Sequence, residues 1–250
     1  MAFCSADFSV HGKEKMKLNI EYNETNYSSD SIPCGRIIKK FYKQLCMNVL
    51  NNAYRYSMSH FDITKEGECP LLFSERNNYS IFASAINNIT PIHLSEWGFN
   101  QNNSASTNTR RVDFYAMYKD GNCARPINFY LELKNGWYCL NKRSQIKIDG
   151  RVIKSIKKLV EQLQNIKLIK PAWNDFDDVY LGIVTIYGYY RQNQKKYTRD
   201  DLYNELFSII DKRIIKNFMV STWSVPEDFP IQWENDRCSF ISIIGLPILP

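Results

Sequence analysis

The stretch INFYLELK, residues 127 to 134, decides how the chain is expected to fold. Successive side chains of a β-strand point to opposite faces of a sheet, so one face of this stretch is wholly apolar: Ile127, Phe129, Leu131 and Leu133. The opposite face carries Glu132 and Lys134 and places a carboxylate beside an ammonium group. Charges on a central strand are usually paired or functional. The sequence leaves two interpretations open: this face contacts water, or it belongs to an active site.

An antiparallel partner for this strand comes just before it in the chain. RVDFYAMY, residues 111 to 118, reads as a strand, and Asp120 with Gly121 is a turn signal. Facing residues of a hairpin have a constant sum of their numbers, and Asp113 with Glu132 gives a midpoint inside this turn. We therefore expect the two carboxylates to lie across from each other, about 5 Å apart. If Asp113 shares the face of Glu132, the face of Leu131 and Leu133 also holds Val112, Phe114, Ala116 and Tyr118.

Helical patterns and one further buried strand surround the hairpin. We expect helices over residues 36–57, from Ser74 toward Pro91, from about 149 to 167 and over 198–217. The apolar run 179–187 reads as a buried central strand, and the segment from Cys238 reads as a last edge strand because it contains Pro247. This order predicts an α/β fold with a central mixed β-sheet flanked by helices.

The domain organisation follows from length and polarity. Residues 1–35 are polar, and we expect them to form a small N-terminal arm with one short strand near 17–22. Residues 36–250 then form a single domain, which is long enough to bury its own core.

The amino-acid composition limits the classes of protein to which this chain can belong. Hydrophobic residues make up 44% of the chain, which is typical of a folded domain. The formal charge of +6 permits an anionic partner such as nucleic acid without requiring one. Seven cysteines at scattered spacing and three histidines form no zinc motif. The sequence shows no secretory signal and no apolar run long enough to span a bilayer, so we expect a cytoplasmic protein without a membrane partner.

The acidic pair points to metal-assisted chemistry. Two carboxylates this close repel each other, and a hard divalent cation such as Mg²⁺ would neutralise them with oxygen ligands. Such an ion polarises a phosphoryl oxygen and activates a bound water, while Lys134 could orient that water or stabilise developing charge. The competing interpretations are a solvated ion pair for Glu132 and Lys134, and a contact of Asp113 with Arg110 or Arg111.

Asp113 followed by Glu132-Leu133-Lys134 on successive strands resembles the D…(D/E)xK signature of the PD-(D/E)XK, or restriction-endonuclease-like, nuclease superfamily. The expected order of helix, three-stranded meander, helix and strand over residues 74–187 is similar to the core of that superfamily and covers a little under half of the chain. Val112 stands where the motif usually begins with proline. The signature is short, and its value rises because the predicted elements around it fall where this fold needs them.

The resemblance implies an Mg²⁺-dependent hydrolase of phosphodiester bonds, in which Mn²⁺ can replace Mg²⁺. Asp113 and Glu132 would bind the metal together with the backbone carbonyl of Leu133. Lys134 would position the attacking water and stabilise the transition state.

A helix before the hairpin supplies a further glutamate in this superfamily. Glu75 is the natural match and would complete the metal site or orient a second water; Glu96, closer to the hairpin, is the alternative. Without the resemblance, Glu75 reads equally well as an acidic residue favoured by the dipole at a helix start. A polar residue from the helix at 149–167 is also implied, with Gln162 and Gln164 as candidates.

The resemblance further implies a nucleic-acid substrate, with DNA favoured over RNA, and a DNA endonuclease of restriction or defence type. Basic residues that could follow a phosphate backbone lie near the start of the helix at 149–167: Lys142, Arg143, Lys147 and Arg151. Many enzymes of this fold act as dimers, so a homodimer is one expected state. The alternative function is a catalytically inactive module on the same fold that binds nucleic acid or a protein.

Overall fold

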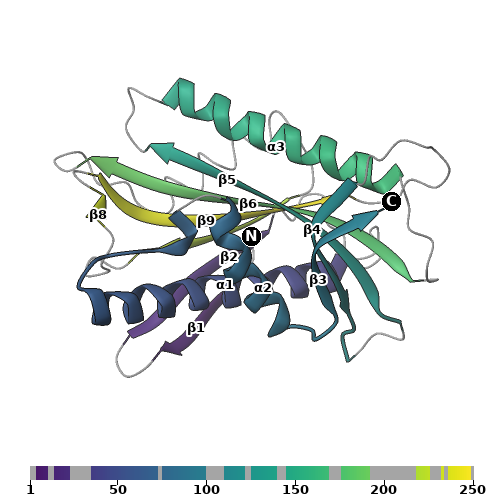
Figure 1. Cartoon of the computed structure of the whole chain (residues 1–250), viewed down its shortest axis with the longest axis horizontal. Coiled ribbons are helices and arrows are strands. Elements are labelled where there is room, and N and C mark those ends of the chain that lie inside the picture. The colour runs from purple at the N-terminus through teal and green to yellow at the C-terminus, as the bar shows by residue number, and fades with distance from the viewer. Residues whose placement is uncertain are drawn as a thin grey trace.

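The protein is an α/β structure in which helices cover both faces of one β-sheet. The computed structural model describes residues 4–10, 14–22, 35–72, 75–99, 110–121, 125–139, 145–168, 176–191, 218–225, 232–233 and 236–248. Helices α1 (Gly35–Thr64) and α2 (Glu75–Asn87) cover one face, with a short 3-10 helix, η2 (Pro70–Leu72), between them in the chain; α3 (Gln145–Leu168) covers the other face (Figure 1). The predicted fold class, a mixed sheet flanked by helices, is confirmed at this level.

The described residues contribute nine strands to the sheet. They are β1 (Cys4–Val10), β2 (Glu14–Tyr22), β3 (His93–Phe99), β4 (Arg110–Tyr118), β5 (Ile127–Cys139), β6 (Asp177–Arg191), β7 (Met219–Ser224), β8 (Gln232–Trp233) and β9 (Asp236–Ile248). Their order is β1-β2-β7-β9-β6-β5-β4-β3, with β8 paired to β9. The β5–β6 pair is parallel and the other described pairs are antiparallel.

Two cores hold the layers together, one on each face of the sheet. The core under α1 and α2 contains Phe41 and Leu45 of α1 and Phe82 of α2. The core under α3 contains the apolar residues of that helix that follow helical spacing: Val152, Ile156, Leu159, Leu163 and Ile166. Because β6 lies between these cores, its residues 179–188 are buried, as its continuous apolar run predicts.

The register of the β4–β5 hairpin is the predicted one. Phe114 pairs with Leu131 and Tyr115 with Tyr130, which gives the same sum as Asp113 with Glu132. The prediction for Val112 is wrong, since this side chain lies in the core under α3 rather than beside Leu131. The pairing with β5 ends at Phe114, so the regular alternation of faces does not extend to Val112.

Two further predictions about strands need correction. The last strand, β9, lies inside the sheet between β6 and β7 and is not an edge strand. Pro247 pairs with Leu181 of β6, but it lies beyond Gly245, where the pairing with β7 ends, so it interrupts no ladder on the β7 side. At the N-terminus, β1 and β2 form two strands where one was expected, and β2 pairs with β7.

The helix expected over residues 198–217 lies outside the described residues. In the described part of the chain, no helix combines the length and the apolar character needed to cross a membrane.

The packing of α3 on β6 depends on Gly182. A Cβ at this position would lie 2.2 Å from Leu159 Cδ2 and 3.1 Å from Leu163 Cδ1, both in the buried core. Because both leucines are fully buried, we expect Gly182→Ala to force them to repack and to lower the free energy of unfolding by about 1–3 kcal/mol. Denaturant titration of the variant measures this loss.

Gly150→Ala is the matched control for this substitution. Gly150 is exposed on α3, and a Cβ there meets no atom within 4 Å. Alanine in a helix is expected to be more stable than glycine by about 0.5–1 kcal/mol. A Gly182→Ala variant as stable as the wild type would contradict the close approach of α3 to β6.

Candidate active site

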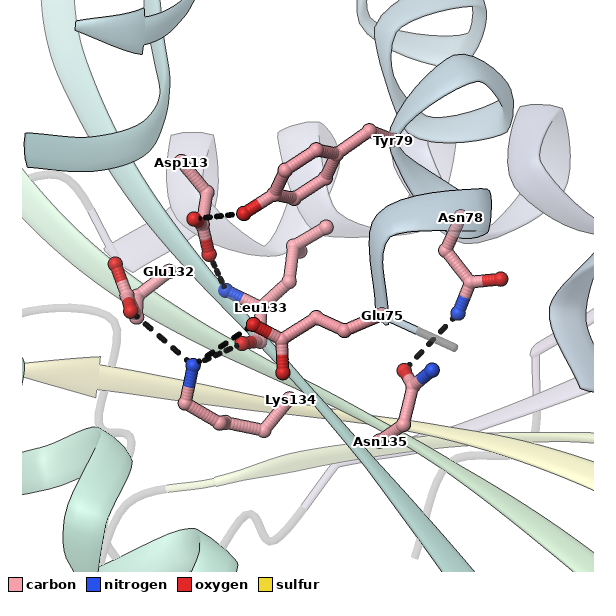
Figure 2. Close-up of polar contacts among 8 residues, drawn as sticks. All are labelled: Glu75, Asn78, Tyr79, Asp113, Glu132, Leu133, Lys134 and Asn135. Carbon is pink, nitrogen blue, oxygen red and sulfur yellow. Dashed lines mark hydrogen bonds and ion pairs between the residues drawn. The ribbon is translucent and has the colours of Figure 1, made fainter. Parts of the chain in front are cut away.

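The candidate site lies where β5 continues beyond its pairing with β4. The β4–β5 pairing ends at Leu131, whereas β6 accompanies β5 as far as Cys139. From Glu132 onward, β5 therefore has a paired neighbour on one side only among the described strands. On the other side, side chains of α2 reach β5 (Figure 2).

Lys134 occupies the centre of this site (Figure 2). Its Nζ donates to Glu75 Oε1 at 3.1 Å, to Glu132 Oε1 at 3.2 Å and to the backbone carbonyl of Leu133 at 2.7 Å. The side chain is only 14% exposed, so these protein oxygens largely replace water around the ammonium group. Burial by itself lowers the pKa of Lys134, but the carboxylates of Glu132 and Glu75 outweigh it and raise the pKa above its usual value.

Glu132 is a buried carboxyl group and not part of a solvated strand face. The residue is 4% exposed, and its neighbour on the same face, Tyr130, is fully buried. The interpretation of this face as a solvated one is therefore wrong. Burial, followed by the nearby charge of Asp113, raises the pKa of Glu132 to about 7, although Lys134 opposes the shift.

Asp113 connects β4, β5 and α2 through its two carboxylate oxygens. The backbone N–H of Leu133 donates to Oδ2 at 2.6 Å, and the hydroxyl of Tyr79 donates to Oδ1 (Figure 2). Among the described contacts, Arg111 does not pair with Asp113; its guanidinium lies 3.8 Å from the carboxylate of Glu96.

The structure distinguishes between the two glutamates considered for the helix position. Glu75 is the first residue of α2 and contacts Lys134. Glu96 lies in β3, its side chain is 60% exposed, and its recorded ion pair is with Arg111. The cluster therefore comprises Glu75, Asp113, Glu132 and Lys134, without Glu96.

Three polar residues around this cluster were not predicted from the sequence. They are Tyr79, Asn78 and Asn135. Asn78 Nδ2 donates to Asn135 Oδ1 at 3.0 Å and to the Tyr187 hydroxyl at 3.2 Å, which links α2 to β5 and β6. Helical spacing offered one signal, since Tyr79 follows Glu75 by four residues and so shares its helix face.

The oxygen atoms gathered here match the ligand chemistry of Mg²⁺. Asp113, Glu132 and the Leu133 carbonyl offer only oxygen donors, and each oxygen of a carboxylate can accept more than one contact. As they stand, no three His, Cys, Asp or Glu side chains among the described residues are grouped closely enough to hold a metal ion. Three carboxyl groups, of Glu75, Asp113 and Glu132, meet here against the single ammonium of Lys134. The donor set therefore fits a divalent cation in type and charge, with Asp113 and Glu132 as the residues that would hold it.

The basic residues predicted to bind nucleic acid are only partly described. Lys142 and Arg143 lie outside the described residues, as do the side chains of Lys147 and Arg151 on α3. Further along α3, the exposed lysines are Lys154, Lys157 and Lys158. Of the two glutamines on this helix, Gln164 is exposed and Gln162 is partly buried.

Comparison with known proteins adds no relative. No family model, no curated protein and no solved structure matches the chain. Any statement about activity therefore depends on the residues of the cluster and on their positions in the fold.

Proposed function

We propose that the protein is a metal-dependent nuclease of the PD-(D/E)XK type that hydrolyses phosphodiester bonds. The observation that carries the proposal is the convergence of Asp113, Glu132, Lys134 and Glu75 at the part of β5 that extends beyond its pairing with β4. The element order α2, β3–β4–β5 meander, α3 and β6, with β6 parallel to β5, supports the same conclusion.

Each residue of the cluster has a role that its contacts support. Asp113 and Glu132 would hold Mg²⁺ with the Leu133 carbonyl; when bound, the ion supplies charge neutralisation and an activated water. Lys134 keeps its ammonium proton because two carboxylates face it, so it can donate to an attacking water or to a phosphoryl oxygen. Glu75 orients Lys134 by accepting from Nζ.

DNA is the favoured substrate, and endonucleolytic cleavage by a cytoplasmic restriction or defence enzyme is the proposed form of the activity. A homodimer acting on duplex DNA is part of this proposal. The positive net charge and the exposed lysines of α3 fit a polyanionic partner.

A second function has one observation in its favour. Both oxygens of Asp113 and the ammonium of Lys134 already have protein partners. A closed polar network of this kind is also what an inactive module would keep for structural reasons. Such a module would bind nucleic acid or a protein without cutting.

Cleavage of a mixed substrate panel separates the two functions. Wild type is incubated with supercoiled plasmid, single-stranded DNA and RNA in Mg²⁺, Mn²⁺ or EDTA. We expect cutting of DNA with either metal and none in EDTA. Nicked or linear plasmid would identify an endonuclease. Binding without cutting under every metal condition would support the inactive module.

Lys134→Ala is the informative variant in this assay. We expect it to cut at least about 10²-fold more slowly, because it removes the charged donor at the reacting centre. Lys119→Ala, at an exposed position directly after β4, is the matched control and should cut like the wild type. Equal rates for Lys134→Ala and wild type would exclude the proposed role of Lys134.

A further inference from the structure

The orientation of the Asp113 carboxylate is fixed by two donors from different elements. Leu133 N–H, from β5, donates to Oδ2 at 2.6 Å. The Tyr79 hydroxyl, from α2, donates to Oδ1. Rotation about the Cβ–Cγ bond of an aspartate is soft, so a carboxylate held by one hydrogen bond can still rotate about that bond. Two donors on opposite oxygens remove that freedom.

The Tyr79 ring is itself held in place by packing. It is partly buried against the core under α1 and α2, and it meets the Phe114 ring edge-on at 5.4 Å between centroids with an angle of 88°. Phe114 directly follows Asp113 on β4, so the same strand positions the ring and the carboxylate it contacts. The hydroxyl therefore reaches Asp113 from a rigid ring.

Helix α2 carries both Tyr79 and Glu75, one turn apart on the same face. Between them, Asn78 is 1% exposed and donates to Asn135 and Tyr187. These two hydrogen bonds fix the position of α2 relative to β5 and β6. The helix thus delivers one group to Lys134 and another to Asp113 from an anchored position.

The chemistry of the donor also suits a metal ligand. A phenol hydroxyl is neutral, so it orients Asp113 without cancelling its charge as an arginine or lysine would. The contact therefore fixes the orientation of Asp113 and places no positive charge beside it.

We propose that Tyr79 is a positioning residue that holds the Asp113 carboxylate in the orientation needed to bind the divalent cation. This inference rests on the proposed nuclease function and extends it to a residue outside the D…(D/E)xK signature. Tyr79 acts through Asp113 and does not itself contact substrate or metal.

The test compares Tyr79→Phe with Tyr56→Phe. Phenylalanine keeps the ring packing on Phe114 and removes only the hydroxyl. Tyr56 donates to Glu68 Oε1 at 3.1 Å near the end of α1, so Tyr56→Phe removes a tyrosine–carboxylate hydrogen bond outside the site. Calorimetric titration with Mn²⁺ measures metal binding without reference to activity. We expect about 10-fold weaker Mn²⁺ binding for Tyr79→Phe, since groups that orient a metal ligand typically contribute 10–100-fold, and no change for Tyr56→Phe.

A double substitution shows whether Tyr79 acts through Asp113. In an Asp113→Asn background, Tyr79→Phe is expected to cause no further loss of the residual cleavage rate. In the single variant, the loss should appear as a higher Mg²⁺ concentration for half-maximal cleavage rate, with KM for the nucleic acid unchanged at saturating Mg²⁺. An independent further loss in the double variant would overturn the positioning role.

The remaining outcomes also decide the question. If wild type and Tyr79→Phe bind Mn²⁺ equally, the positioning role is wrong while the nuclease proposal stands. If Tyr79→Phe is unfolded in EDTA while Tyr56→Phe is folded, the hydroxyl serves folding and the positioning role is overturned. If the wild type itself binds no Mn²⁺ and cuts nothing, the proposed function fails and this inference fails with it.

Discussion

Asp113→Asn should abolish Mg²⁺-dependent cleavage almost completely, by at least about 10³-fold in rate at saturating substrate. The substitution removes one negative charge from the pair that would hold the cation, and the cation supplies several kcal/mol of charge stabilisation in the transition state. No other carboxylate of the cluster is placed to replace it, because Glu132 is the second proposed ligand and Glu75 is paired with Lys134. Single-turnover cleavage of an end-labelled DNA measures the rate.

Asparagine is the most informative substitution at this position, because it removes the charge and can keep both hydrogen bonds of Asp113. Its amide oxygen can accept from Leu133 N–H, and its amide nitrogen can donate to the Tyr79 hydroxyl, which rotates to accept. Circular dichroism and thermal unfolding in EDTA should therefore resemble those of the wild type. A folded Asp113→Asn variant that cuts at the wild-type rate would remove Asp113 from the proposed site.

Glu132→Gln should stabilise the metal-free protein at alkaline pH. Burial raises the pKa of Glu132 from its ordinary 4.5 to about 7, so the folded chain binds more protons than the unfolded chain between these pH values. Stability of the wild type therefore falls as pH rises through this window, and the cost of the ionised carboxylate is complete above about pH 7. Glutamine carries no charge, so we expect the variant to be more stable by roughly 2 kcal/mol at pH 8 and similar to the wild type near pH 4.5.

Urea titrations in EDTA at pH 8 and near pH 4.5 would measure this effect. Glu161→Gln, at an exposed position on α3, is the control for loss of a surface carboxylate and should match the wild type at both pH values. Saturating Mg²⁺ should reverse the order, because a cation that binds only the folded wild type stabilises it and not Glu132→Gln. A Glu132→Gln variant that is less stable at pH 8 in EDTA would mean that the Lys134 ion pair outweighs the cost of burying the charge.

The hairpin and the helix stripe were predictable because local sequence fixes them. A turn signal and the alternation of apolar residues set the register of β4 and β5, and the spacing of apolar residues marked the buried face of α3. The position of β9 was not predictable in this way, because which strands lie beside it is decided by distant segments. Pro247 suggested an edge, yet it lies beyond the end of the β7 pairing and so interrupts no ladder on that side.

In the site, too, the residues close together in the sequence were predictable, and those that depend on distant packing were not. Asp113, Glu132 and Lys134 were predicted together because one hairpin carries all three. Glu75 could only be named beside Glu96, since the sequence does not say which glutamate reaches β5. Tyr79 and Asn78 looked like ordinary polar residues of a helix until the packing of α2 against β5 gave them partners.

The claim that Asp113 and Glu132 hold a divalent cation is tested most directly by calorimetric titration of Mn²⁺ at pH 8, with wild type, Asp113→Asn and Glu132→Gln side by side. We predict saturable binding by the wild type, which weakens as pH falls below about 7 because protons compete for Glu132, and no saturable binding by either variant. A wild type without saturable binding, or variants that bind as well as the wild type, would contradict the proposed metal site.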